Sequence, residues 1–163
     1  MKKLVLFDLD GTLVNAGGAG RTALKKTFEE LYGSCPEFEH SLISGRTDTD
    51  NFTLVYGLLK NGKKPTAAEM KKMTAKYLEL LPIEVHAAVR AKHYDLVAGV
   101  EKFLKLLQKD PDVILALGTG NLEKGARIKL EPSGLNSFFE LGGFGEDGHT
   151  REDMLLAAVK RAE

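Results

Sequence analysis

The sequence has no tryptophan, five prolines and one cysteine, Cys35. A single cysteine excludes an internal disulfide bond and a thiolate metal cluster. The chain also has no net charge, because 23 lysines and arginines balance 23 aspartates and glutamates. It therefore lacks the basic excess typical of nucleic-acid-binding domains, and we expect no nucleic-acid partner. No apolar run approaches the roughly 20 residues that cross a bilayer, so we expect no membrane association and a cytoplasmic location.

The composition is typical of a globular protein, with 43% hydrophobic and 28% charged residues in a chain of 163. That length suffices for one buried core, or for a core with a small insert. The apolar run at residues 4–7 is too short for the core of a signal peptide, and Asp8 ends it. The run predicts a first β-strand that is buried on both faces.

The order of the predicted elements divides the chain into two kinds of segment. The apolar spacing is helical from about residue 15 to 94, whereas strands and helices alternate after residue 98. Such alternation predicts an α/β fold with a doubly wound, Rossmann-like parallel sheet. We therefore expect a core of residues 1–14 and 95–163, with an all-helical domain of residues 15–94 inserted after the first strand. Predicted helices span 19–31, 50–60, 66–94 (interrupted at Pro82), 100–107, 121–130 and 151–162, and predicted strands span 4–7, 113–117 and 138–141.

Two carboxylates follow the first predicted strand, at the edge of the sheet where α/β proteins bind ligands. Asp8 and Asp10 are two residues apart, so the period of a strand places them on the same side. Two such charges lie close together at lower cost when a cation is between them, and Mg²⁺ prefers oxygen ligands. Gly11 would allow a sharp turn, and Thr12 could donate a hydrogen bond. The alternative is an ordinary strand and turn, because Asp and Gly are common in turns.

The second predicted strand ends in the same manner, in Gly118-Thr119-Gly120-Asn121. The Thr119 hydroxyl and the amides of Gly120 and Asn121 would face an anion at the N-terminus of the following helix, where partial positive charge gathers. The alternative is a plain N-cap, with Thr119 or Asn121 capping that helix.

Residues 7–14, FDLDGTLV, resemble the first motif, D-x-D-G-T-[LV], of the haloacid dehalogenase-like (HAD) superfamily, and residues 114–121 resemble its second motif. The resemblance implies that Asp8 is the nucleophile and forms an aspartyl-phosphate. It implies that Asp10 is the general acid and base, and that Mg²⁺ is held by Asp8 and the Asp10 backbone carbonyl. The true dehalogenases of the superfamily lack the second aspartate, so Asp10 favours phosphoryl transfer, in which an alkoxide leaving group needs an acid.

The superfamily's third motif is a lysine or arginine that balances charge on the nucleophile and phosphate, and two residues could supply it here. Arg151 follows the third predicted strand and a glycine-rich loop at 142–148. Lys129 lies within the helix after Thr119, roughly 12 Å along its axis at 1.5 Å per residue. That distance is long for a contact between Lys129 and the phosphate, so we favour Arg151. A solvated surface cation is the alternative for each residue.

The superfamily's fourth motif, an acidic pair after a further strand, has no counterpart that we can assign. The sequence ends at Glu163, inside the predicted helix that should lead to that strand. The C-terminal part of the core is therefore missing from these 163 residues, either because they are part of a longer chain or because the protein is naturally incomplete. If the protein ends there, we expect it to bind metal weakly and to be poorly active.

The helical domain of residues 15–94 matches the position of the superfamily's C1 cap, which closes over the site and selects the substrate. The glycine-rich segment 16–20 is a candidate hinge. Arg21 and Arg46 are candidate contacts to an anionic substrate, with a surface salt bridge as the alternative for each. His40, His86, His93 and His149 share no metal-ligand spacing, and we interpret them as bystanders.

The sequence resembles the phosphoglycolate-phosphatase-like members of the superfamily. This resemblance implies a Mg²⁺-dependent phosphatase that acts on a small phosphorylated metabolite. A phosphomutase of the β-phosphoglucomutase type is an alternative, because it shares the aspartate pair but returns the phosphoryl group to a sugar. A phosphate-binding module without catalysis is a third possibility, because the fourth motif is absent. No pattern in the sequence specifies an oligomeric state.

Overall fold

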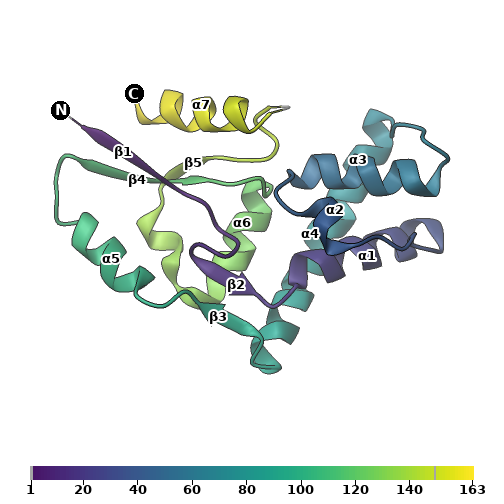
Figure 1. Ribbon diagram of the computed structural model, residues 1–163, viewed down its shortest axis with the longest axis horizontal. Coiled ribbons are helices and arrows are strands. Elements are labelled where there is room, and N and C mark those ends of the chain that lie inside the picture. The colour runs from purple at the N-terminus through teal and green to yellow at the C-terminus, as the bar shows by residue number, and fades with distance from the viewer. Residues whose placement is uncertain (1, 149) are drawn as a thin grey trace.

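The structure of the chain is a computed structural model that describes residues 2–148 and 150–163. Met1 and His149 lie outside the described residues, and the interpretation of His149 as a bystander falls there. An α/β part and a helical part lie side by side, and both ends of the chain belong to the α/β part (Figure 1).

Three parallel strands form the main sheet, in the order β1 (Lys3–Phe7), β4 (Val113–Gly118) and β5 (Leu141–Gly143). The α/β fold class with a parallel sheet is therefore confirmed. β1 lies at an edge of this sheet within the described residues, and its residues 4–6 are only partly buried. Residues 4–6 are less buried than predicted, because no described strand pairs with the outer edge of β1 and this edge is open.

Helices cover both faces of this sheet, as a doubly wound fold requires. Helix α7 (Arg151–Ala162) lies on one face, and α5 (Val100–Leu107) and α6 (Glu123–Leu130) lie on the other (Figure 1). The short helices η1 (Glu131–Ser133) and η2 (Leu135–Phe138) follow α6, so β5 begins three residues later than the predicted strand at 138–141. The hydrophobic cluster between the sheet and α5–α6 includes Phe7, Leu9, Leu104, Leu115, Leu117, Ala126, Leu130 and Phe139.

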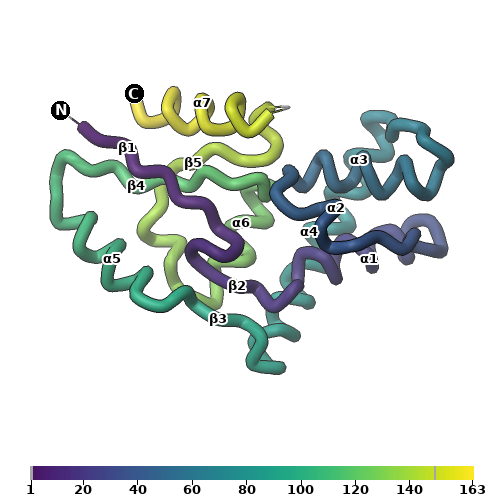
Figure 2. Tube along the Cα trace, viewed as in Figure 1, coloured from purple at the N-terminus to yellow at the C-terminus, as the bar shows by residue number. Residues whose placement is uncertain are grey.

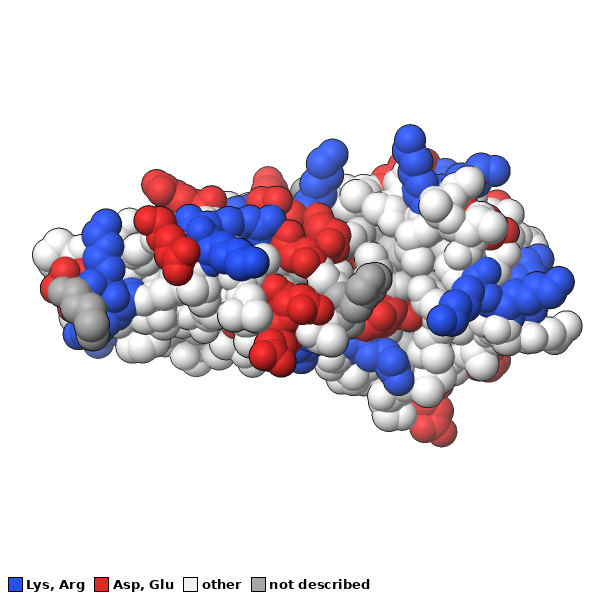
Figure 3. All heavy atoms as spheres, turned by 90° about the horizontal axis from the view of Figure 1, so that it is seen from above, with Lys and Arg blue, Asp and Glu red and all other residues white. Residues whose placement is uncertain are grey.

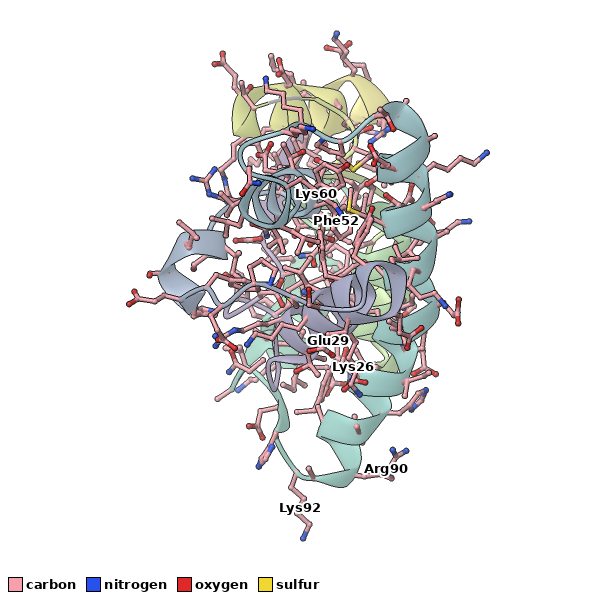
Figure 4. All side chains as sticks on the ribbon, turned by 90° about the vertical axis from the view of Figure 1, so that its right-hand side faces the viewer. Lys26, Glu29, Phe52, Lys60, Arg90 and Lys92 are labelled. Atoms are coloured by element: carbon pink, nitrogen blue, oxygen red, sulfur yellow. The ribbon has the colours of Figure 1, made fainter. Side chains whose placement is uncertain are left out.

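Helices α1 (Ala19–Tyr32), α2 (His40–Ile43), α3 (Asp48–Leu59) and α4 (Ala67–Arg90) form the helical part around a second hydrophobic cluster. Phe52 lies inside this group of helices in Figure 4, whereas Arg90 and Lys92 project at the end of α4. A capping box begins α4, because the Thr66 and Glu69 side chains each accept a hydrogen bond from the other's backbone amide.

Pro82 lies inside α4 and does not interrupt it, which corrects the predicted break. A proline inside a helix removes one backbone hydrogen bond and costs about 3 kcal/mol. Burial offsets this cost, because Met73, Tyr77, Leu81 and Val85 form a fully buried stripe along the same helix.

A two-stranded antiparallel sheet joins the two parts, and the sequence did not predict it. In it, β2 (Val14–Ala16) pairs with β3 (Tyr94–Leu96) (Figure 2). Both strands have three residues, which is too few for a recognisable alternating pattern. Gly17 follows β2 with φ of +58°, and a Cβ at this position would lie 2.7 Å from the carbonyl oxygen of His93. The chain therefore enters and leaves the helical part at one place, where close packing requires a glycine.

Acidic and basic side chains are interspersed on the side of the molecule that carries α7 (Figure 3). One ion pair there is bidentate, because the guanidinium of Arg161 donates to both oxygens of Asp147 at 2.5 and 2.6 Å. Within the described residues, no helix combines the length and the apolar character that a membrane span needs.

Candidate active site

A cavity of about 630 Å³ lies between the carboxyl edge of the main sheet and the helical part. The register of β1 and β4, with Phe7 opposite Leu117, brings the residues after each strand to this edge. Asp8 and Thr119, which are 111 positions apart in the sequence, therefore line the same cavity. The other predicted site residues that line it are Asp10, Gly11, Arg21, Arg46, Gly120, Asn121, Lys129 and Arg151.

The turn after β1 depends on Gly11, which has a φ of +79° that residues with a side chain rarely adopt. Thr12 follows it with an exposed side chain and is not among the described residues that line the cavity. The backbone amide of Thr12 donates to the Leu9 carbonyl at 3.2 Å. The structure thus places Thr12 in the turn and not on the wall of the cavity.

Lys129 has the most buried charge at the site, with a residue exposure of only 6%. Its ammonium donates to both carboxylate oxygens of Asp10, at 3.0 and 2.8 Å, and to the Asn121 side-chain oxygen at 2.6 Å. The Asn121 amide nitrogen in turn donates to Asp10 at 2.9 Å and to the Thr119 hydroxyl at 2.7 Å. A continuous hydrogen-bonded network therefore links the acid of the first motif to the threonine of the second.

Lys129 therefore reaches the site and is buried, so the predicted long distance and the alternative of a surface cation were both wrong. The helix begins at Glu123 and not at Asn121, so Lys129 lies only six residues into it. Side chains on a helix also point toward its N-terminus, and the long lysine side chain spans the distance that remains.

Arg151, the favoured candidate for the third motif, lies beside the other carboxylate. Its guanidinium is 3.7 Å from Asp8 Oδ2, and both side chains are close to half exposed. The other oxygen, Asp8 Oδ1, accepts a hydrogen bond from the backbone amide of Leu9 at 2.8 Å. Each aspartate thus has its own cation, and the closer and more buried pair is the one between Lys129 and Asp10.

The first backbone amides of α6 bind protein carboxylates, whereas the predicted anion site at Thr119, Gly120 and Asn121 comes just before them and lines the cavity. The Leu122 amide donates to Asp48 Oδ2, and the Glu123 amide donates to Glu146, both at 2.9 Å. The Asn121 amide donates to the Thr119 hydroxyl at 3.3 Å. Leu122 is the N-cap residue and makes no side-chain cap, so neither Thr119 nor Asn121 caps this helix.

Asp48 is a site residue that sequence reasoning missed. It is the first residue of α3, lines the cavity and connects the helical part to α6 through the bond to Leu122. Burial of its carboxylate raises the pKa of Asp48 to about 6, and Lys129 and the Leu122 amide offset part of this rise. The spacing Asp48–Asn51 was a usable signal, because residues three apart share one face of a helix and both of these line the cavity.

Arg21 and Arg46 line the cavity from the helical part. The Arg21 guanidinium donates to the Phe38 carbonyl at 3.2 Å, and that of Arg46 donates to the Leu42 carbonyl at 3.0 Å. Neither arginine makes a salt bridge within the described residues, so the alternative of a surface salt bridge is not observed for either of them. Gly120 brings this segment close, because a Cβ on Gly120 would lie 2.7 Å from the Arg46 carbonyl oxygen.

The oxygen atoms of Asp8 offer a partial metal site. Asp8 Oδ2 makes no hydrogen bond within the described residues, since its arginine neighbour is 3.7 Å away. In the part of the chain that the structure describes, no three His, Cys, Asp or Glu side chains are grouped as metal ligands. Mg²⁺ commonly takes one or two protein carboxylates and completes its shell with water and substrate phosphate, so this donor set fits it.

The family model for haloacid dehalogenase-like hydrolases matches residues 5–163 of the chain. The chain therefore belongs to this family of hydrolases, and the resemblance seen in its motifs is confirmed.

Solved structures with the same fold include CbbY from Rhodobacter sphaeroides in complex with phosphate, at 17% identity and a TM-score of 0.72. They also include β-phosphoglucomutase from Clostridium difficile, at 14% identity and a TM-score of 0.74. A third is a predicted phosphatase from Clostridium acetobutylicum, at 20% identity and a TM-score of 0.68. The matches cover 99, 98 and 99% of this chain, and 73, 70 and 71% of the respective neighbours. The search of curated proteins found no match.

Proposed function

We propose that this hydrolase is a Mg²⁺-dependent phosphatase that cleaves a small phosphate monoester through an aspartyl-phosphate on Asp8. One observation carries the proposal. Two carboxylates at a strand end, a buried lysine, an arginine and a threonine surround one cavity. The complex of the structural neighbour CbbY with phosphate supports phosphate as the group bound at such a site.

In the proposed reaction the Asp8 carboxylate attacks phosphorus, and the bond between phosphorus and the ester oxygen breaks. Asp10 enters this step as the carboxylic acid and donates its proton to the departing alcohol. Asp10 then takes a proton from the water that attacks the aspartyl-phosphate, which releases phosphate and restores Asp8. The bonds from Lys129 and Asn121 orient the Asp10 carboxylate for both transfers.

The cationic side chains and Thr119 have distinct proposed roles. Arg151 lies beside Asp8 and is placed to balance the charge of the incoming phosphate. Thr119 is fully buried, and its hydroxyl accepts from Asn121, so its own proton can be donated to a phosphoryl oxygen. Asp8 and the Asp10 backbone carbonyl would hold Mg²⁺, which would neutralise phosphate charge when bound.

We also propose that residues 15–94 act as a cap over a core of residues 1–14 and 95–163. The β2–β3 pair at both crossings between the two parts supports this division. Arg21 and Arg46 would then meet an anionic substrate from the cap side, because their charges lack carboxylate partners within the described residues.

The test is hydrolysis of p-nitrophenyl phosphate with and without Mg²⁺. Asp8→Asn keeps the size of the side chain but removes the nucleophile, and we expect a loss of about 1,000-fold or more in kcat. Asp95→Asn is the matched control, since Asp95 is exposed on β3 and does not line the cavity. Equal activity of Asp8→Asn and wild type would refute the mechanism.

The phosphomutase remains the second candidate, because the fold matches β-phosphoglucomutase as well. Incubation with a sugar phosphate separates the two. A mutase retains the phosphoryl group on Asp8 until a sugar accepts it, whereas a phosphatase releases inorganic phosphate. Phosphate binding without Mg²⁺-dependent turnover would instead identify a binding module.

A further inference from the structure

Two buried, uncharged polar side chains line the cavity from the helical part, and no assigned role accounts for them. Tyr77 on α4 is 2% exposed and Asn51 on α3 is 9% exposed. Buried polar groups nearly always have a hydrogen-bond partner, so a pair without one calls for a functional explanation.

The Tyr77 hydroxyl makes no hydrogen bond to any described residue. A Cβ placed on Gly20 would lie 3.3 Å from this hydroxyl and 3.2 Å from the Lys129 ammonium, so the hydroxyl lies near the Lys129–Asp10 pair. Phe52 holds the tyrosine ring edge-on at a centroid distance of 5.3 Å. Burial raises the pKa of Tyr77 well above its usual value, with smaller contributions from Asp48 and Asp10. The hydroxyl therefore stays protonated and can donate a hydrogen bond.

The Asn51 side chain likewise has a polar atom without a hydrogen-bond partner. Its amide oxygen is buried without a hydrogen-bond partner among the described residues. Asn51 lies one turn after Asp48 on the face of α3 that meets the cavity. A carboxamide can both donate and accept, so it suits a partner that does the same.

The surroundings of these two groups indicate the chemistry of that partner. Leu24, Ile43 and Phe52 line the same cavity, so the helical wall has apolar surface beside these two neutral groups, as well as the charged Arg21, Arg46 and Asp48. The arginines suit an anion, whereas the apolar surface and the neutral groups suit the organic part of a substrate. Alcohol hydroxyl groups are neutral and can donate and accept at once.

Tyr56 on α3 shows the arrangement that a purely structural tyrosine has in the same helical part. Its hydroxyl donates to the Glu69 carboxylate, and it does not line the cavity. Tyr77 differs on both points.

We propose that the Tyr77 hydroxyl and the Asn51 carboxamide bind hydroxyl groups on the alcohol portion of the substrate. The substrate class is then the phosphate esters of small polyols or sugars. This inference rests on the proposed function, and it names the substrate class of the same site.

The experiment compares glycerol 1-phosphate with n-propyl phosphate, which has the same carbon chain and no free hydroxyl group on it. The readout is the ratio of kcat/KM for the two esters, measured with Mg²⁺ in the full chain. Losing one neutral hydrogen bond of about 1.4 kcal/mol corresponds to about tenfold. We therefore expect Tyr77→Phe to lower the ratio about tenfold and Asn51→Ala to lower it in the same direction, while Tyr56→Phe leaves it unchanged.

A ratio that stays at the wild-type value in both Tyr77→Phe and Asn51→Ala overturns the subsite, because loss of packing would affect the two esters alike. Failure of the proposed function is detected separately. In the Asp8→Asn background, the affinities for the two esters are measured by calorimetry with and without Tyr77→Phe. A tenfold fall in the affinity ratio supports the subsite even if the wild-type chain hydrolyses neither ester, and an unchanged ratio overturns it even if both are hydrolysed.

Discussion

The two walls of the cavity differ in how far their polar groups bind one another. On the sheet side, Asp10, Lys129, Asn121 and Thr119 form one network of direct hydrogen bonds. On the helical side, Asn51 and Tyr77 have no such partners within the described residues. The folded chain therefore orders the polar groups of the sheet side by itself, whereas Asn51 and Tyr77 on the helical side are left for the substrate that we propose.

The strongest way to break the sheet side is Lys129→Met, which keeps the length of the side chain and removes its charge. Asp10 would lose two of its three side-chain hydrogen bonds and would no longer be held in place. We expect kcat/KM for p-nitrophenyl phosphate to fall about 100-fold, within the range of general acid–base effects. Lys124→Met is the matched control, since Lys124 is exposed on the same helix. An equal loss in both variants would mean that α6 had been perturbed as a whole.

Arg151→Met tests the weaker of the two ion pairs. Its contact with Asp8 is longer and close to half exposed, so solvent screens it more. We expect kcat/KM to fall about tenfold, less than for Lys129→Met. The two variants are compared in the same assay at the same Mg²⁺ concentration. A larger loss for Arg151→Met would make Arg151 the principal cation and reverse the ranking that the geometry supports.

The link between the two walls is sensitive to pH through Asp48. Its pKa of about 6 in the folded chain is above the value of about 3.9 for an unfolded aspartate. Between these values the folded state binds the proton more tightly, so stability decreases as pH rises from about 4 to 6. Asp48→Asn cannot ionise, and we expect it to gain about 1–2 kcal/mol relative to wild type over this interval, discounting the full shift for partial exposure.

Urea unfolding at pH 4 and pH 7 gives the free energy of unfolding of wild type and of Asp48→Asn. The gain is the amount by which the difference between the two proteins grows from pH 4 to pH 7. Asp50→Asn is the control, because Asp50 is on the same helix but does not line the cavity. A difference between wild type and Asp48→Asn that is independent of pH would show that Asp48 ionises normally.

The sequence alone determined the features that depend on neighbouring residues. The turn at Gly11, the capping box of Thr66 and Glu69, and the placement of Asp8 and Thr119 after two strands are all local patterns. Parallel strands bring their carboxyl ends to one edge, so these patterns were enough to predict one shared cavity. The α/β fold and the hydrolase family followed from the same short segments and are confirmed.

Tertiary structure alone decided which helix positions reach the cavity. A helix returns to the same face every 3.6 residues, and the packing of α3, α4 and α6 selects the faces that hold Asp48, Tyr77 and Lys129. Lys129 was interpreted as a remote surface cation because the sequence pattern shows neither where α6 begins nor that the helix packs beside Asp10. The β2–β3 pair was equally hard to predict, since each strand has only three residues and the paired residues lie 78 to 82 positions apart in the sequence.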